Sequence, residues 1–200
     1  MSWIHTIPFD EAKGQLRKLY ERVVGPDHNV DNILMVHSLR PHTLLGHMAL
    51  YKNVIHNANN AVPKSFLETL GVSVSMLNRC HYCTEHHFAG LKRLIGDEKA
   101  LPIREAFEKE TLESAFTPKE LKALQYARKL TFCQHLLTGN DVDELRQSGW
   151  EDGEILEINQ VVSYFNYANR TVTGLGVSTD GDVLGLSPND SDDPENWGHS

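Results

Sequence analysis

Apolar residues recur along most of the chain at the spacing of three and four residues that is typical of amphipathic helices. The spacing predicts about eight helices joined by short connections, with clusters of Gly, Pro and Asn between them. The longer predicted helices cover residues 9–22, 41–56, 63–78, 80–95, 97–112, 117–131 and 152–172, and shorter ones lie at 33–36 and 142–145. No segment alternates with the period of two that a half-buried strand requires, so the pattern indicates an all-α fold.

Two of these helices carry particularly clear signals. The run Thr117-Pro118-Lys119-Glu120 combines an N-cap residue, a proline in the first turn and the glutamate of a capping box. The segment 152–172 is apolar on more than one face, which predicts a central and largely buried helix. The predicted N-cap residues of other helices are Asp31, Asn140 and Asp152.

The composition changes after Val177, where the chain becomes rich in Asp, Ser, Gly and Pro. Residues 177–200 contain six acidic residues and neither Lys nor Arg, so they carry most of the formal net charge of −8. We therefore expect one domain over residues 1–177 and an acidic tail over residues 178–200. The tail is interpreted as a solvated end, either disordered or lying on a neighbouring subunit.

Composition also narrows the function classes. A chain of 200 residues with 40% hydrophobic content can bury a core of ordinary size. It contains no run of 18 apolar residues, so no membrane span is expected. Its first residues lack the basic and apolar regions of a secretory signal, and we expect a cytoplasmic protein. Without a basic patch the acidic chain is not expected to bind nucleic acid.

Two of the three cysteines lie in one short stretch, Arg79-Cys80-His81-Tyr82-Cys83-Thr84-Glu85-His86-His87. Cys80, Cys83 and His87 fall on one face of a helix, and a dithiol beside an imidazole is typical of a redox site or a metal site. The start of that helix favours thiolates through its unpaired N–H groups and its dipole. An antiparallel hairpin with the preceding helix would bring Glu68 to the pair, where it could accept a proton directly, through His87 or through a water.

Glu68, Cys80, Cys83 and His87 together resemble the E-x11-C-x2-C-x3-H signature of the alkyl hydroperoxidase D-like (AhpD-like) proteins, within the carboxymuconolactone decarboxylase-like superfamily. The resemblance is to the bacterial peroxidase-related branch in particular and covers about residues 5–177. It implies an AhpD-like all-α domain with the CxxC at the start of a central helix. It also implies a homo-oligomer (dimer, trimer or hexamer) and thiol-dependent reduction of a hydroperoxide, with an external dithiol or protein as reductant and no cofactor.

The resemblance assigns the peroxide-attacking thiol to Cys83, the resolving thiol to Cys80, and a proton relay to Glu68 and His87. The better-known relatives carry a histidine at the position of Tyr82, so the chain departs from them within the motif. The helix dipole, in contrast, favours Cys80 as the thiol of lower pKa. Both assignments hold if Cys80 faces solvent and exchanges with the reductant, and this is the arrangement that we expect. Cys83 is then expected to lie deeper, beside His87.

The alternative is a metal-binding, redox-sensing or disulfide-exchange module without peroxidase turnover. Its metal ligands would be Cys80, Cys83 and His87, with His86 or Glu68 as the fourth. Structural zinc usually takes ligands from two separated pairs, and the sequence has no second CxxC.

The remaining polar residues are given structural interpretations. We expect surface positions for His81 and His86, a small buried hydrophobe in Cys133, scattered positions for His37, His42, His47 and His56, and packing partners in Asn159, Asn166, Asn169 and Arg170.

Overall fold

The computed structural model describes residues 2–25 and 29–198, and this part of the chain is helical with no β-strand. It contains nine α-helices: α1 (Gly14–Val23), α2 (Asn32–Met35), α3 (Pro41–Ile55), α4 (Lys64–Leu77), α5 (His81–Ile95), α6 (Asp97–Glu108), α7 (Pro118–Phe132), α8 (Gly139–Gln147) and α9 (Asp152–Leu175). Three single turns of 3₁₀-helix lie at Phe9–Glu11, Leu112–Ser114 and Gln134–Leu136. The predicted all-α fold is confirmed.

The largest boundary differences lie at the starts of α1 and α8, at the end of α6, which stops at Glu108 instead of 112, and at the end of α9, which continues to Leu175. The expected helix over 9–22 is divided, because Lys13 is extended and Gly14 has a φ of 57°, so a 3₁₀ turn precedes α1. The capping box of Thr117 at the start of α7 is confirmed. Helix α8 is capped by Thr138 rather than Asn140, and α9 by Glu151 rather than Asp152.

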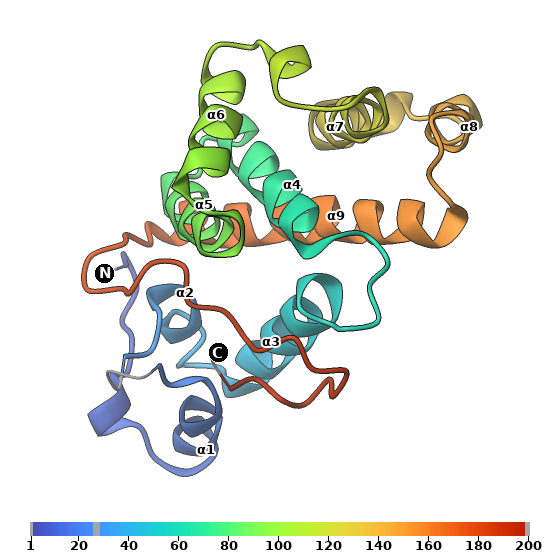
Figure 1. Ribbon diagram of the computed structural model, residues 1–200. Helices are drawn as coiled ribbons and strands as arrows, with labels where there is room; N and C mark the ends of the chain where they lie inside the picture. Colours follow the sequence, from blue (N-terminus) through green and yellow to red (C-terminus); the bar gives the residue numbers. More distant parts are fainter. Residues whose placement is uncertain (1, 26–28, 199–200) are drawn as a thin grey trace.

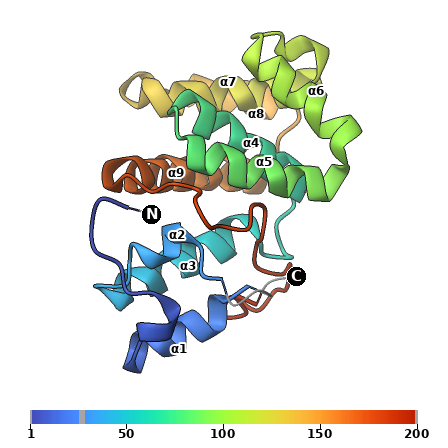
Figure 2. The same cartoon turned by 90° about the vertical axis from the view of Figure 1, so that its left-hand side faces the viewer.

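Helix α9 runs through the middle of the molecule, with α4 to α8 on one side and α1 to α3 on the other (Figures 1 and 2). Its apolar residues pack against α4 and α7 in the largest hydrophobic cluster. This burial was predicted from the apolar residues on more than one face of the helix. A second cluster joins α1 to α3. Helices α4 and α5 lie side by side above α9, and the CxxC stands where they meet.

The helices α4 and α9 approach closely at Gly71. A Cβ atom added at this position would lie 2.2 Å from the ring of Phe165, so only glycine permits this approach. Helix α9 ends at Gly176, whose φ of 62° is the left-handed conformation that favours glycine at a helix C-cap.

The acidic C-terminal segment does not form a solvated end, because it packs on the helices of its own chain. After α9 it turns back and passes along α2 and α3 toward α1 (Figure 2). Trp197 is 1% exposed in the second hydrophobic cluster, and the guanidinium of Arg22 lies 3.6 Å from the centre of its ring. The segment is held because its acidic groups and carbonyls meet cationic side chains from the helices, including the ion pair of Lys64 with Asp190.

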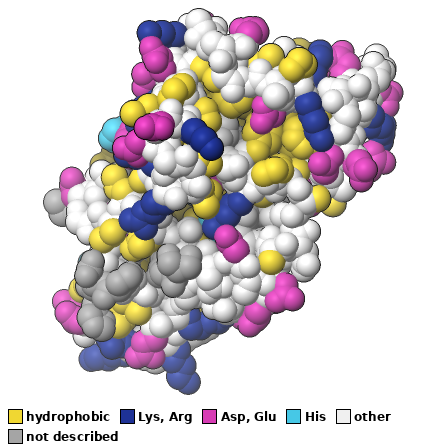
Figure 3. All heavy atoms as spheres, in the orientation of Figure 1, with side chains coloured by type: hydrophobic (Ala, Val, Ile, Leu, Met, Phe, Trp, Pro, Cys, Tyr) yellow, Lys and Arg dark blue, Asp and Glu magenta, His cyan; other side chains and the backbone are white. Residues whose placement is uncertain are grey.

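The charges of the molecular surface are mixed. On the face in Figure 3, Lys and Arg side chains are interspersed with Asp and Glu, which follows from the near balance of charges outside the C-terminal segment. Among the described residues, no helix combines the length and apolar character needed to span a bilayer.

Candidate active site

The turn between α4 and α5 places the two cysteines at the start of α5. Arg79 adopts a φ of 56°, which is uncommon for a residue with a side chain and reverses the chain within one position. The N–H of Cys80 donates to the carbonyl of Ser75 at 2.8 Å, which closes the end of α4. Cys80 is the N-cap residue of α5 and Cys83 lies in its first turn, as the sequence predicted.

Both thiols are free and adjacent, with 2.9 Å between Cys80 Sγ and Cys83 Sγ. The hydrogen bond from Cys83, together with the backbone N–H of Cys83, lowers the pKa of Cys80 to about 7 despite burial. The shared hydrogen bond and burial raise the pKa of Cys83 well above its ordinary value. The dithiol therefore loses its first proton at Cys80, in line with the expectation from the helix N-terminus.

The antiparallel hairpin of α4 and α5 brings Glu68 to His87, as expected. His87 Nδ1 lies 2.7 Å from Glu68 Oε2, and the carboxylate is 2% exposed. Burial raises the pKa of Glu68, but the charge and hydrogen bond of His87 outweigh it and leave this pKa below its ordinary value. A second imidazole, His56 Nε2 on the far side, lies 3.9 Å from Glu68 Oε1. The carboxylate is thus held ionised between two histidines.

A cavity of about 50 Å³ opens between the helix pair α4–α5 and helices α3 and α9. Cys83, Glu68 and His87 line it, together with the rings of Tyr51 and Tyr164. Its lining does not include Cys80. The cavity therefore places one thiol, a carboxylate and an imidazole around a small space with apolar walls.

The expectation that Cys80 faces solvent is wrong. Cys80 is 2% exposed and Cys83 is 3% exposed, so the two thiols are equally buried. Cys80 packs against Val36, Val172 and Val177, since the segment that follows α9 passes over the start of α5. Cys83 alone of the pair borders the cavity, so the thiols differ in what they face rather than in depth.

Comparison of the sequence with protein-family models and with curated proteins finds no match. Comparison of the structure with solved structures finds several. A peroxidase-related protein from Ralstonia eutropha JMP134, described as an alkylhydroperoxidase AhpD core, gives a TM-score of 0.76 at 21% sequence identity, over 88% of this chain and 91% of that one. A peroxidase-related protein from Silicibacter sp. TM1040 gives 0.77 at 22% identity, with the same coverage. The chain has the AhpD-like fold.

The debrominase Bmp8 has a similar structure, with a TM-score of 0.65 at 16% identity over 82% of this chain and 85% of its own. A peroxidase-related protein and a debrominase thus both resemble this chain in fold. At these identities the likeness concerns the fold, and the chemistry has to be argued from the residues of the cavity.

Tyr82 occupies the position at which the better-known relatives carry a histidine, and it is hydrogen-bonded to the C-terminal segment. Its hydroxyl donates to Asp182 Oδ2 at 2.6 Å and accepts from the N–H of Ile33 at 3.2 Å. His86 Nε2 lies 3.2 Å from the same carboxylate oxygen, and the N–H of Asn32 also donates to Asp182. Tyr82 thus anchors the chain beside the thiols and is not a free acid–base group, since burial raises its pKa well above the ordinary value.

The residues of the alternative metal site do not converge. His87 faces Glu68, whereas His86 faces Asp182 on another side of α5. In the described part of the chain, no group of three or more His, Cys, Asp or Glu residues is placed to hold a metal ion.

Several other sequence interpretations are changed by the structure. His86 is buried, contrary to expectation, whereas His81 is exposed as expected. Cys133 is half-buried rather than fully buried. Asn169 is the structural partner it was expected to be, because it bonds Ser75 and accepts from Asn78.

Sequence reasoning missed the buried histidines. His56 lies against Glu68, and the tilted rings of His37 and His47 have centres 5.1 Å apart although the residues are ten positions apart. Burial lowers the pKa of His56, and that of His47 to about 3, so both are neutral at pH 7. Their spacing fits no single helical face, so no periodic signal could have found them.

Proposed function

We propose that this AhpD-like chain is a thiol peroxidase that reduces small hydroperoxides with Cys83, Cys80, Glu68 and His87. The observation that carries the proposal is the cavity, which Cys83 shares with the Glu68–His87 pair. A thiol, a proton donor and a space for a small oxidant are the parts that peroxide reduction needs.

The reaction begins with the reduced pair, in which Cys83 hydrogen-bonds to the Cys80 thiolate. Transfer of the Cys83 proton to Cys80 leaves a Cys83 thiolate, which attacks the terminal oxygen of the hydroperoxide and breaks the O–O bond. His87, which is hydrogen-bonded to Glu68, gives a proton to the leaving oxygen, so the alcohol departs and Cys83 becomes a sulfenic acid.

The second half of the reaction closes the disulfide. Cys80 attacks the sulfenic sulfur of Cys83, hydroxide leaves, and the proton of Cys80 completes a water molecule. One hydroperoxide and two thiols give one alcohol, one water and one disulfide. An external dithiol or protein reductant then supplies two electrons and two protons to restore the thiols.

The size of the cavity favours peroxides over larger substrates. A solved neighbour of this fold, a variant of the debrominase Bmp8, is in complex with 2,3,4-tribromopyrrole. A cavity that takes up benzene measures about 150 Å³, whereas this one measures about 50 Å³. A brominated ring does not fit that space, but hydrogen peroxide does. We further propose that the protein is a cytoplasmic homo-oligomer.

The test is quench-flow oxidation of the reduced protein by hydrogen peroxide, with mass spectrometry of the cysteines. The Cys133→Ser protein serves as the reference, because it leaves only the two site thiols. We expect one Cys80–Cys83 disulfide per peroxide, no consumption by Cys83→Ser, and a trapped Cys83 sulfenic acid in Cys80→Ser. Glu68→Gln should slow the first step by about 10²–10⁴-fold.

Two outcomes contradict the proposal. Peroxide consumption by Cys83→Ser with a sulfenic acid on Cys80 would reverse the roles of the thiols. A dithiol that oxidises once but is not turned over by any thiol reductant would instead indicate a redox-sensing module, the alternative function of the sequence.

A further inference from the structure

The C-terminal segment forms one wall of the catalytic cavity. Residues 182–188, called the strap here, follow α9 by a short turn and cross the cavity beside α5. Gly185, Leu186, Ser187 and Pro188 all line the cavity that Cys83, Glu68 and His87 share. Apart from Asp31, the other lining residues belong to helices.

The strap lies directly against the backbone of α5. A Cβ atom added to Gly185 would be 2.8 Å from the carbonyl carbon of Ala89 and 2.8 Å from the nitrogen of Gly90. The φ of Gly185 is also 78°, a conformation that residues with side chains rarely adopt. Next to it, the side chain of Leu186 lies close to Gly25, since a Cβ atom added to Gly25 would be 3.1 Å from Leu186 Cδ1. The strap is thus packed so closely that no room is left for a further atom at Gly185.

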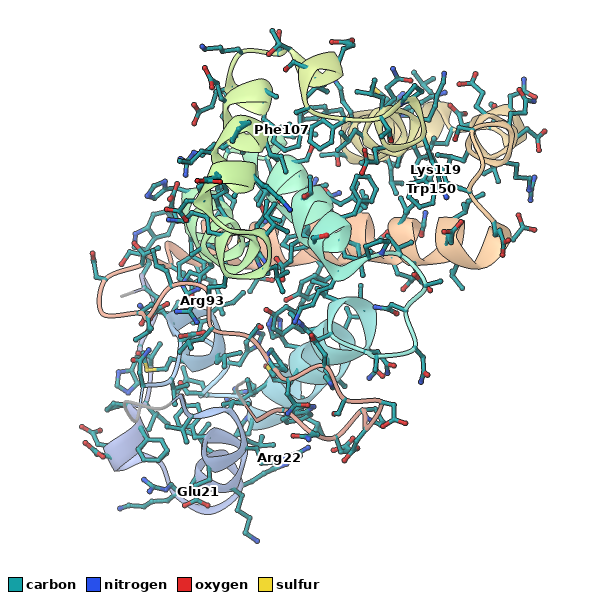
Figure 4. The ribbon with its side chains drawn as sticks, viewed as in Figure 1. Glu21, Arg22, Arg93, Phe107, Lys119 and Trp150 are labelled. Atoms are coloured by element: carbon teal, nitrogen blue, oxygen red, sulfur yellow. The ribbon has the colours of Figure 1, made fainter. Side chains whose placement is uncertain are left out.

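Buried or cationic groups bind the strap at its start, in its middle and just beyond its end. At its start the carboxylate of Asp182 is 1% exposed and binds the hydroxyl of Tyr82 and the imidazole of His86. In its middle Arg93 of α5 donates to the carbonyl of Leu184 at 3.0 Å (Figure 4). Beyond its end the fully buried ammonium of Lys52 donates to the carbonyl of Asn189 at 2.5 Å. These contacts hold the strap against α3 and α5 along the cavity.

We propose that the strap is the specificity-determining wall of the site and restricts it to hydroperoxides without bulky substituents. This inference rests on the proposed peroxidase function and adds the element of the fold that sets the substrate class. With the strap in place the cavity measures about 50 Å³, so it admits hydrogen peroxide or a short alkyl hydroperoxide. A cavity that takes up benzene measures about 150 Å³, and displacement or trimming of the strap would supply additional space for an aryl substituent.

Gly185→Ala and Leu186→Ala test the wall in two ways. The first adds a methyl group that must push the strap away from α5, and the second trims a side chain of the strap that borders the cavity and contacts Gly25. Gly181→Ala is the matched control: its φ of 86° imposes the same backbone strain, but nothing lies within 4 Å of the added atom. All variants carry Cys133→Ser and are compared with that protein, and a thermal melt verifies that each is folded.

Two readouts are measured. The first is the ratio of kcat/KM for cumene hydroperoxide to kcat/KM for hydrogen peroxide. The second does not require turnover: it is the ratio of the alkylation rates of Cys83 by N-phenylmaleimide and by iodoacetamide, with mass spectrometry to locate the adduct. We expect both ratios to rise by roughly tenfold or more in Gly185→Ala and Leu186→Ala and to stay unchanged in Gly181→Ala.

The two readouts separate the failure of this inference from that of the proposed function. A raised alkylation ratio in proteins that consume no peroxide supports the strap as the wall and rejects the peroxidase. An alkylation ratio that is unchanged in folded Leu186→Ala and Gly185→Ala, or that rises equally in Gly181→Ala, overturns the inference. If Gly185→Ala does not fold, Leu186→Ala alone decides by the same criterion.

Discussion

Replacement of Gly71 by alanine tests how the helix packing supports the site. The added Cβ would lie 2.2, 2.3 and 2.9 Å from three ring atoms of Phe165, whereas carbon atoms pack best at about 3.5–4.0 Å. The ring cannot retreat freely, because it is fully buried and stands edge-on to His87 with 4.5 Å between the ring centres. The strain at Gly71 is therefore passed on to the imidazole of the proton relay.

The expected change in unfolding free energy on Gly71→Ala is the sum of two opposing contributions. Overpacking of a core costs about 1–3 kcal/mol, and this contact lies at the severe end of that range. The better helix propensity of alanine returns about 1 kcal/mol. We expect Gly71→Ala to lose about 2 kcal/mol of unfolding free energy, which for this chain length lowers the Tm by roughly 4–8 °C. We also expect slower oxidation of Cys83, because His87 is displaced.

The assay is urea denaturation of Gly71→Ala beside Gly46→Ala, a matched control in α3. Nothing lies within 4 Å of a Cβ atom at the exposed Gly46, so that variant should gain about 0.5–1 kcal/mol. Phe165→Leu in the Gly71→Ala background should restore part of the loss, which a double-mutant cycle measures. The reasoning is refuted if Gly71→Ala is as stable as wild type, or if Phe165→Leu and Gly71→Ala lower the stability additively.

Two further predictions concern the anchoring of the C-terminal segment and the pH dependence of stability. Lys52→Met removes the buried ammonium that donates to the carbonyls of His56, Asn189 and Ser191. We therefore expect urea denaturation to show a loss of about 3–5 kcal/mol of unfolding free energy, together with faster proteolysis after residue 189. A variant as stable as the wild type would contradict this prediction. Burial raises the pKa of Asp31 to about 6, so between about pH 4 and 6 the folded state binds a proton that the unfolded state has released. The stability that this bound proton contributes is full below about pH 4 and is lost as the pH rises through about 6. Asp31→Asn should therefore raise the unfolding free energy at pH 7.5 by up to about 3 kcal/mol and change it little at pH 4, and an equal effect at both pH values would show that the carboxyl is not the cause.

The hairpin that carries the site could be read from the sequence. The spacing of Glu68, Cys80, Cys83 and His87 is set by the pitch of two helices and a tight turn, and each of these is encoded by residues close in the chain. The same holds for the capping box of Thr117. Local periodicity and capping act within a few residues, so their signals survive without knowledge of the tertiary structure.

The destination of the acidic segment could not be read in this way. Asp182 binds Tyr82 across 100 positions of the chain, and Lys52 binds Asn189 across 137. Composition suggested a solvated tail because acidic residues usually prefer water. Buried donors elsewhere in the fold reverse that preference, since each offers a charged or polar partner that the isolated segment lacks.

The sequence by itself thus determined the all-α class, most of the helices and the group of four residues at the CxxC. Only the tertiary structure decided that Cys80 is as buried as Cys83, that His56 stands against Glu68 and that the strap closes the cavity. The physical reason is the range of the interactions. Helix formation depends on neighbours three and four residues apart, whereas burial, cavity shape and the environment of a thiol depend on which helix faces meet.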